Sequence, residues 1–218
     1  RRYPHPMHPE PIEAVLFDSD GTLVDTETIS NEVMCDVLGR HGIQVTVEEA
    51  VREWSGVDLH EMLRGLQERT RVTLPTDFLD RFRAEQKVAL EERTEEIAGA
   101  GAMLGDLQLP RAVVSNAPVQ KVSLCLRTAG LMHHFDPERI YSAYDVGVWK
   151  PAPDVYLHAA ASIGVDPRRC AVVEDSVSGV EAGRAAGCRV FAYDAAGHLP
   201  DWPDVTRLDA LPALLQHL

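Results

Sequence analysis

Short apolar runs alternate with helical segments along much of the chain. Ala14–Phe17 is apolar throughout and has the length of a buried strand. From Arg111 onward, strands are predicted around Val113, Tyr141 and Val172, each followed by a helical pattern, with a further strand at 189–193. This alternation predicts an α/β fold with a doubly wound parallel sheet.

The segment between the first strand and residue 96 has a different pattern. Apolar residues recur there at helical spacing, in the segments Ile29–Leu38, Val47–Trp54, Leu59–Leu66 and Asp77–Arg93. A further helix, over 99–107, leads into the second strand of the core. We therefore expect an α/β core formed by residues 11–24 and 96–218, interrupted by an all-helical insertion over residues 25–95.

Composition narrows the functional classes. The 218-residue chain has a formal net charge of -13, which argues against a nucleic-acid-binding surface. No apolar stretch approaches the roughly 20 residues of a membrane helix, so no membrane association is expected. The cysteines form no C-x-x-C pair and are expected to be reduced core residues, in keeping with a cytoplasmic location; they are Cys35, Cys125, Cys170 and Cys188. The first ten residues, rich in Pro and His, predict a loose terminus rather than a metal site.

Polar residues follow the predicted strands at the points where the strands end. Asp18 and Asp20 come after the first strand, Ser115-Asn116 after the second, Lys150 after the third and Glu174-Asp175 after the fourth. Taken singly, these could be an Asx-Gly turn, a helix N-cap or a solvated lysine. Because the carboxyl ends of parallel strands share one crevice, the groups are expected to converge there.

In this order and spacing, the motifs resemble those of the haloacid dehalogenase-like phosphohydrolase superfamily. The resemblance implies that Asp18 is a nucleophile that forms an aspartyl phosphate and that Asp20 is the general acid and base. It also implies that Ser115 and Lys150 bind the phosphate. Mg²⁺ would be held by Asp18, the backbone carbonyl of Asp20 and Asp175, with Glu174 in direct contact or one layer out.

The helical insertion resembles the cap of the phosphoglycolate phosphatase and β-phosphoglucomutase branch of this superfamily. In that branch, the loop corresponding to 54–60 enters the site, although a plain helix connector is the alternative here. The expected substrate-binding residues are Asn116, Glu27, Gly56, Asp58, His60 and Lys121.

The resemblance implies a Mg²⁺-dependent phosphatase acting on a small phosphorylated metabolite, such as a sugar phosphate or a sugar-acid phosphate. Within the superfamily, the segments around Ser115 and Lys150 are most similar to the bacterial 6-phosphogluconate phosphatase type. A phosphomutase is the enzymatic alternative, although Gly56-Val57 is followed by Asp58-Leu59 here and not by the serine and arginine of the mutases. A catalytically dead phosphate-binding module is the other alternative, and it would normally have lost Asp18 or Asp20. The oligomeric state is left open.

Overall fold

The core of the molecule is a six-stranded sheet in the order β5-β4-β1-β6-β7-β8, with all neighbouring strands parallel. The computed structural model describes residues 10–54, 59–195 and 197–218, so the N-terminal residues 1–9 lie outside the description. The strands are β1 (Ala14–Phe17), β4 (Arg111–Ser115), β5 (Ile140–Ser142), β6 (Cys170–Glu174), β7 (Arg189–Tyr193) and β8 (Thr206–Leu208).

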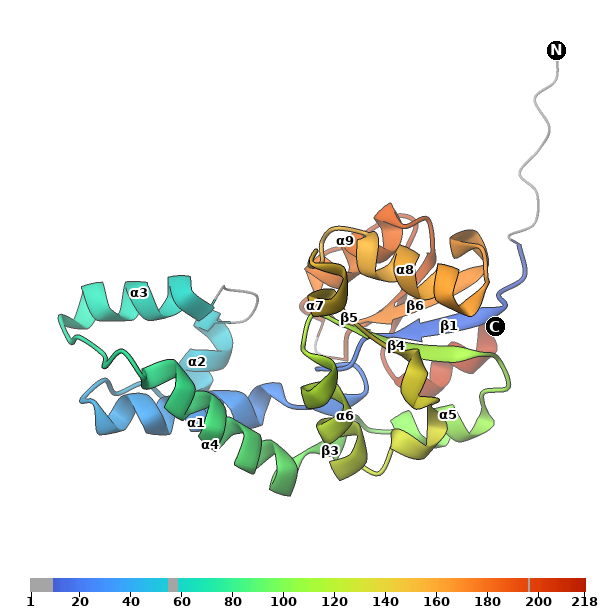
Figure 1. Ribbon diagram of the computed structural model, residues 1–218. Helices are drawn as coiled ribbons and strands as arrows, with labels where there is room; N and C mark the ends of the chain where they lie inside the picture. The colour runs from blue at the N-terminus through green and yellow to red at the C-terminus, as the bar shows by residue number, and fades with distance from the viewer. Residues whose placement is uncertain (1–9, 55–58, 196) are drawn as a thin grey trace, which may run out of the picture.

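Helices cover both faces of this sheet (Figure 1). The residues of β1 alternate between the two layers: Val15 and Phe17 pack in one apolar cluster, and Ala14 and Leu16 pack in the other. The first cluster includes α5 (Ala100–Asp106), α6 (Val119–Thr128) and the 3₁₀ helix Leu211–Gln216. The second includes α8 (Asp154–Ile163) and α9 (Val177–Ala185). This arrangement confirms the predicted doubly wound α/β fold.

Shorter helical turns complete the connections of the core. They are α7 (Ala143–Val146) and the 3₁₀ turns Met132–His134, Pro137–Arg139 and Pro167–Arg169. Asp136 and Asp166 each accept a hydrogen bond from the backbone two residues on, which caps a turn that begins with proline.

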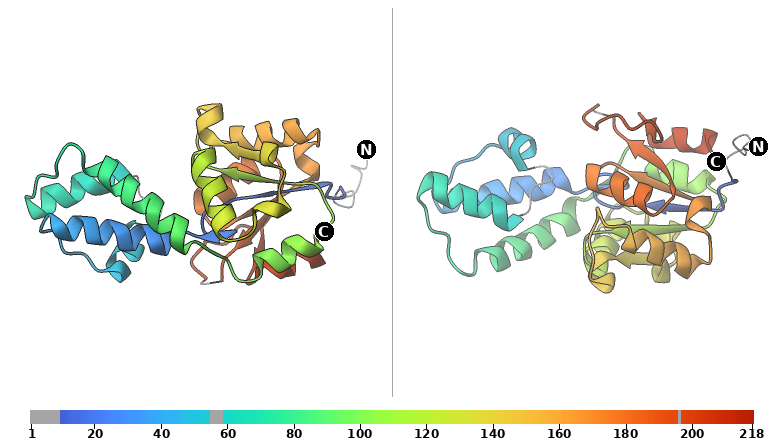
Figure 2. Two further views of the ribbon diagram at one scale, coloured as in Figure 1. Left: turned by 60° about the horizontal axis from the view of Figure 1, so that its bottom comes forward. Right: turned by 90° about the horizontal axis from the view of Figure 1, so that it is seen from above.

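Four helices form a separate group beside the sheet (Figures 1 and 2). They are α1 (Glu27–Arg40), α2 (Val47–Trp54), α3 (Leu59–Thr70) and α4 (Phe78–Arg93). Their buried side chains form an apolar cluster of their own, which includes Leu38, Leu63, Leu66 and Phe82. The group therefore has a hydrophobic cluster of its own, while Ile29 of α1 and Leu90 of α4 join the first apolar cluster of the core.

The two connections between this helical group and the sheet lie side by side. β2 (Val24–Asp25) and β3 (Glu95–Glu96) pair as antiparallel strands, with Val24 opposite Glu96. The sequence did not predict these strands, because two residues are too few to show an alternating pattern. The pairing holds the exit and re-entry of the chain together next to the carboxyl end of β1.

The described cysteines are free thiols, as expected. Cys125 and Cys170 are buried, and Cys188 is partly buried against the second apolar cluster, as expected of core residues. Cys35 on α1 is only partly buried and belongs to neither cluster of the core, so the expectation was wrong for this residue. Over residues 10–54, 59–195 and 197–218, no helix has both the length and the apolar character that a bilayer crossing needs.

Candidate active site

The site lies at the carboxyl ends of three adjacent strands, β4, β1 and β6. The strand order reverses at β1, and ligands in open α/β sheets bind at such a reversal. Directly after β1 the chain turns sharply: the Asp18 amide bonds to the Val173 carbonyl at 2.9 Å, and Gly21 adopts a φ of 84°. A Cβ atom at Gly21 would lie 2.1 Å from Oδ2 of Asp175, so both the backbone angle and the close approach require glycine.

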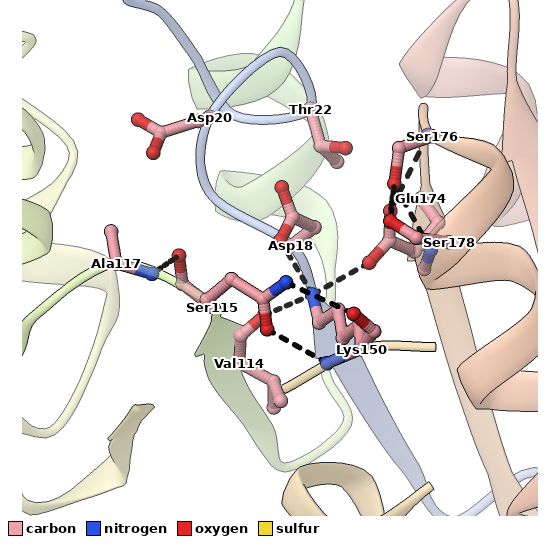
Figure 3. Close-up of polar contacts among 12 residues, drawn as sticks. Asp18, Asp20, Thr22, Val114, Ser115, Ala117, Lys150, Glu174, Ser176 and Ser178 are labelled. Atoms are coloured by element: carbon pink, nitrogen blue, oxygen red, sulfur yellow. Dashed lines mark hydrogen bonds and ion pairs between the residues drawn. The ribbon is translucent and has the colours of Figure 1, made fainter. Parts of the chain in front are cut away.

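Lys150 connects the three strand ends. Its ammonium donates to Oδ1 of Asp18 at 2.6 Å, to Oε1 of Glu174 at 2.6 Å and to the Val114 carbonyl at 2.8 Å (Figure 3). All three ammonium hydrogens therefore have an acceptor. Burial alone lowers the pKa of Lys150, but the negative charges of Asp18 and Glu174 outweigh burial and raise it. The lysine is thus a fixed positive charge beside Asp18.

Three carboxylates lie together beside this lysine, and its single positive charge cannot balance them. Asp18, Glu174 and Asp175 each offer an oxygen atom, and these atoms lie within 4.8 Å of one another. Burial, together with Glu174 and Asp175, raises the pKa of Asp18 well above its usual value, although Lys150 opposes the shift. Burial and Glu174 raise the pKa of Asp175 to about 7. An all-oxygen site with excess negative charge fits a hard divalent cation such as Mg²⁺.

Neighbouring hydroxyl groups orient the two acidic residues at the carboxyl end of β6. Thr22 donates to Oδ1 of Asp175 at 2.7 Å. Glu174 is fully buried, and it also accepts from the Tyr156 hydroxyl at 2.6 Å and from the Ser176 hydroxyl at 3.0 Å. Both oxygens of Glu174 are therefore already bonded to protein groups, whereas Asp175 accepts from Thr22 at Oδ1.

Asp20 belongs to a different group of contacts. Its carboxylate accepts from Nζ of Lys121 at 2.9 Å and from the Thr26 hydroxyl at 2.6 Å. Burial on its own raises the pKa of Asp20, but the charge of Lys121 and these hydrogen bonds lower it overall. In Figure 3 the Asp20 carboxylate points away from Asp18, although the two residues share one turn.

Ser115 and Asn116 end β4 beside Asp18. The Ser115 hydroxyl oxygen accepts from the Ala117 amide at 3.0 Å, which leaves its hydrogen to be donated elsewhere. Oδ1 of Asn116 accepts from the Lys150 amide at 2.9 Å. Asn116 thus holds the segment that carries Lys150, a role that its sequence position did not indicate. Its contact with a substrate stays a prediction.

The predicted residues of the helical insertion are placed less closely. Glu27 is exposed at the start of α1, and His60 is exposed in the first turn of α3. Gly56 and Asp58 lie outside the described residues. The structure therefore brings together the residues predicted at the strand ends, and the substrate contacts expected of the insertion stay predictions.

Sequence reasoning missed the roles of Thr22, Thr26 and Tyr156, each of which orients an acidic side chain of the site. Thr22 and Thr26 lie within eight residues of Asp18, so their closeness to the first motif was a usable signal. Tyr156 lies on α8, which begins after Lys150. Only the packing of α8 on the sheet brings the Tyr156 hydroxyl to Glu174.

Fold and site together define the chain as an α/β protein with an acidic, lysine-anchored site at the strand-order reversal of its sheet. Its sequence matches the haloacid dehalogenase-like hydrolases over residues 12–187. The chain belongs to this family, and it is a hydrolase. The match confirms the resemblance drawn from the motifs.

Individual relatives span almost the whole chain. The 6-phosphogluconate phosphatase of Escherichia coli is 36% identical over 209 residues, which cover 93% of this chain and 94% of that protein. Hexitol phosphatase A of the same organism is 33% identical over 85% of this chain and 84% of its own length. Among solved structures, a haloacid dehalogenase family hydrolase from Deinococcus radiodurans with bound phosphate and sodium is 34% identical. It has a TM-score of 0.79 and covers 94% of this chain and 93% of its own.

Proposed function

We propose that the protein is a Mg²⁺-dependent phosphomonoesterase that hydrolyses a small phosphorylated metabolite through an aspartyl phosphate on Asp18. The single observation that carries this proposal is the position of Lys150, which holds Asp18 at 2.6 Å beside the acidic pair Glu174-Asp175. A nucleophile, a fixed positive charge and a cation site then lie at one point, as transfer of a phosphoryl group requires.

The reaction proceeds in two displacements. In the first, an oxygen of Asp18 attacks phosphorus, the bond from phosphorus to the ester oxygen breaks, and Asp20 gives its proton to the leaving oxygen. In the second, Asp20 takes a proton from water, whose oxygen attacks phosphorus and releases Asp18 and inorganic phosphate. Asp20 therefore starts and ends in the same protonation state.

Two side chains act on the phosphate in this proposal, one by its charge and one by a hydrogen bond. Lys150 keeps Asp18 in place and neutralises charge that gathers on the phosphate oxygens. Ser115, whose hydroxyl oxygen accepts from the Ala117 amide, donates its hydrogen to a phosphate oxygen. Both side chains are nearly inaccessible to solvent, which strengthens their electrostatic effect on a bound anion.

The residues that would hold Mg²⁺ are Asp18 and Asp175 through their carboxylates and Asp20 through its backbone carbonyl. When bound, the ion neutralises the acidic cluster and draws charge from the phosphate. Because Glu174 is engaged by Lys150, Tyr156 and Ser176, it acts from the layer behind the metal-binding oxygens.

We propose a sugar phosphate or a sugar-acid phosphate, such as 6-phosphogluconate, as the substrate. The proposal is supported by similarity to the 6-phosphogluconate phosphatase and to hexitol phosphatase A. Helices α1–α4 act as a cap that closes over the crevice and reads the part of the substrate that is not phosphate. A phosphomutase is the alternative, because the same core can pass the phosphoryl group to a second sugar oxygen.

The test is phosphate release from a panel of sugar phosphates and sugar-acid phosphates in the presence of Mg²⁺. We expect release by the wild type and none above background by Asp18→Asn, since an amide cannot serve as the nucleophile. Asp36→Asn, an exposed site on α1, is the control and should retain activity. Conversion of a sugar phosphate to its isomer without phosphate release would favour the mutase, and binding without turnover would favour a dead phosphate-binding module.

A further inference from the structure

Lys121 links Asp20 to the core helix α6. Its ammonium lies 2.9 Å from Oδ2 of Asp20, across 101 residues of sequence. The other oxygen of Asp20 accepts from Thr26 at 2.6 Å. The orientation of this carboxylate is therefore fixed at both oxygens, by two residues from different elements.

The turn after β1 thereby divides two carboxylates that are only two residues apart. Asp18 is held by Lys150 and shares the acidic cluster with Glu174 and Asp175. Asp20 is not a member of that cluster, and its side chain is directed to the other side of the turn (Figure 3). Asp18 thus pairs with Lys150, and Asp20 pairs with Lys121.

The two lysines differ in how much of each side chain reaches solvent. The side chain of Lys150 is 2% exposed and has an acceptor for each of its three hydrogens. The side chains of Lys121 and Asp20 are 28% and 31% exposed, so this pair reaches solvent. A carboxylate that must exchange protons with a leaving group and with water needs such access, and it also needs a fixed position.

We propose that Lys121 is a positioning residue, an inference that rests on the proposed function. Lys121 holds the Asp20 carboxylate on the leaving-group side of Asp18 and out of the cation site. Without Lys121, Asp20 loses the contact at Oδ2 and can turn toward Asp18 and Asp175, the residues that would hold the cation. The proton transfer to the leaving oxygen then slows, while the attack by Asp18 is little affected.

Leaving groups of different basicity separate this role from a general loss of structure. A sugar phosphate leaves as a strongly basic alkoxide and needs a proton from Asp20, whereas p-nitrophenyl phosphate leaves as a weakly basic phenolate and needs it little. We expect Lys121→Met to lower kcat for the sugar phosphate by about tenfold or more, since general acid catalysis typically contributes about 10²–10⁴-fold. Formation of the aspartyl phosphate from p-nitrophenyl phosphate, measured as the burst of nitrophenolate, should be nearly unchanged.

Further variants complete the test. Lys121→Arg keeps the charge and should recover most of the sugar-phosphate activity, and Lys87→Met, at an exposed lysine of α4, should behave as the wild type. In an Asp20→Ala background, Lys121→Met should cause little further loss, because a residue that acts through Asp20 has nothing left to position. Lys121→Gln repeats each comparison if the methionine variant does not fold.

Equal losses for both substrates, or a full additional loss in the Asp20→Ala background, would overturn the inference and indicate that Lys121 contacts the substrate directly. In both cases the wild type still releases phosphate, so the proposed function stands. A folded wild type that releases no phosphate from either substrate would overturn the proposed function, and this inference with it.

Discussion

The hydroxyl of Tyr156 donates a 2.6 Å hydrogen bond to Oε1 of Glu174, the same oxygen that accepts from Lys150. Tyr156 and Glu174 are both fully buried, and the Lys150 ammonium lies 4.8 Å from the centre of the tyrosine ring. Charge, hydroxyl and aromatic ring thus support one another in a place closed to water. A buried carboxylate needs such partners, because an unpaired one costs several kcal/mol.

Tyr156→Phe should therefore destabilise the protein although it removes a single oxygen atom. A hydrogen bond to a charged group contributes about 1.5–3 kcal/mol, and its loss leaves Glu174 with one donor fewer. For a chain of this size, the melting temperature should fall by about 2–4 °C per kcal/mol. Tyr144→Phe is the control, because Tyr144 is 57% exposed. Equal melting temperatures for wild type and Tyr156→Phe would mean that the bond to Glu174 contributes nothing net.

Gly179→Ala should disturb the carboxylate of Glu174 by a steric clash. A Cβ atom at Gly179 would lie 1.8 Å from the carboxyl carbon of Glu174, so the side chain or α9 must move. Overpacking of this kind costs about 1–3 kcal/mol. Gly65→Ala on α3 meets open space and should be neutral or stabilising, since alanine is the better helix former. Chemical denaturation of the two variants measures the contrast, and similar effects at both positions would contradict it.

Much of the core could be predicted from the sequence, because it rests on local patterns. The apolar run Ala14–Phe17 is buried in full and becomes the central strand β1. Once the strands were predicted as parallel, the meeting of Asp18, Lys150 and Asp175 at one sheet edge followed from topology. The predicted helix Val47–Trp54 agrees with α2 to the residue.

The contacts of individual side chains could not be predicted in the same way. Lys121 is one of many polar residues on amphipathic helices, and its pairing with Asp20 depends on how α6 lies against the turn after β1. The contact of Tyr156 with Glu174 could not be predicted either, since the sequence pattern of α8 indicates only that Tyr156 is a buried aromatic residue. The short strands β2 and β3 pair across 70 residues of helical insertion, and two-residue strands leave no periodic signal.

Asp194, after β7, should make the stability of the core depend on acid. It accepts from the His198 and Leu199 amides at 2.8 and 3.0 Å and pairs with Arg207. Burial alone raises the pKa of Asp194, but these bonds and the charge of Arg207 lower it overall. Because the pKa of Asp194 is lower in the folded protein than its ordinary value near 3.8, the ionised carboxylate stabilises the fold above that pH. This stabilisation is lost as the pH falls below 3.8 and through the folded-state pKa.

Asp194→Asn should therefore lower the free energy of unfolding by about 1–3 kcal/mol at pH 7, and the difference from wild type should shrink as the pH falls from about 5 toward 3. Asp201→Asn is a matched control, since Asp201 also pairs with Arg207 but its side chain is 99% exposed. Exposed pairs contribute little. Urea titrations at several pH values measure both, and a difference that stays constant down to pH 3 would contradict the role of the Asp194 charge.

The acidic cluster should make activity depend on a divalent cation. Chelation should abolish phosphate release and added Mg²⁺ should restore it. The reason is that the negative charges of Asp18, Glu174 and Asp175 together exceed the positive charge of Lys150. Asp175→Asn should raise the Mg²⁺ concentration for half-maximal activity by about tenfold or more. Titration calorimetry with Mg²⁺ provides a readout that does not require turnover. Asp106→Asn, exposed at the end of α5, should leave the requirement unchanged, and full activity after exhaustive chelation would exclude a metal-dependent reaction.

The helical insertion should control which substrate is hydrolysed rather than whether transfer occurs. Asp58→Ala and His60→Ala should change the relative kcat/KM values across a sugar-phosphate panel more than they change hydrolysis of p-nitrophenyl phosphate. The reason is that contacts remote from phosphorus position the substrate, while residues at the strand ends perform the transfer. Arg64→Ala, at an exposed position of α3, is the control. A uniform loss over every substrate, or no change at all, would mean that the segment after α2 is only a connector, and specificity would then be sought at Asn116, Lys121 and Glu27.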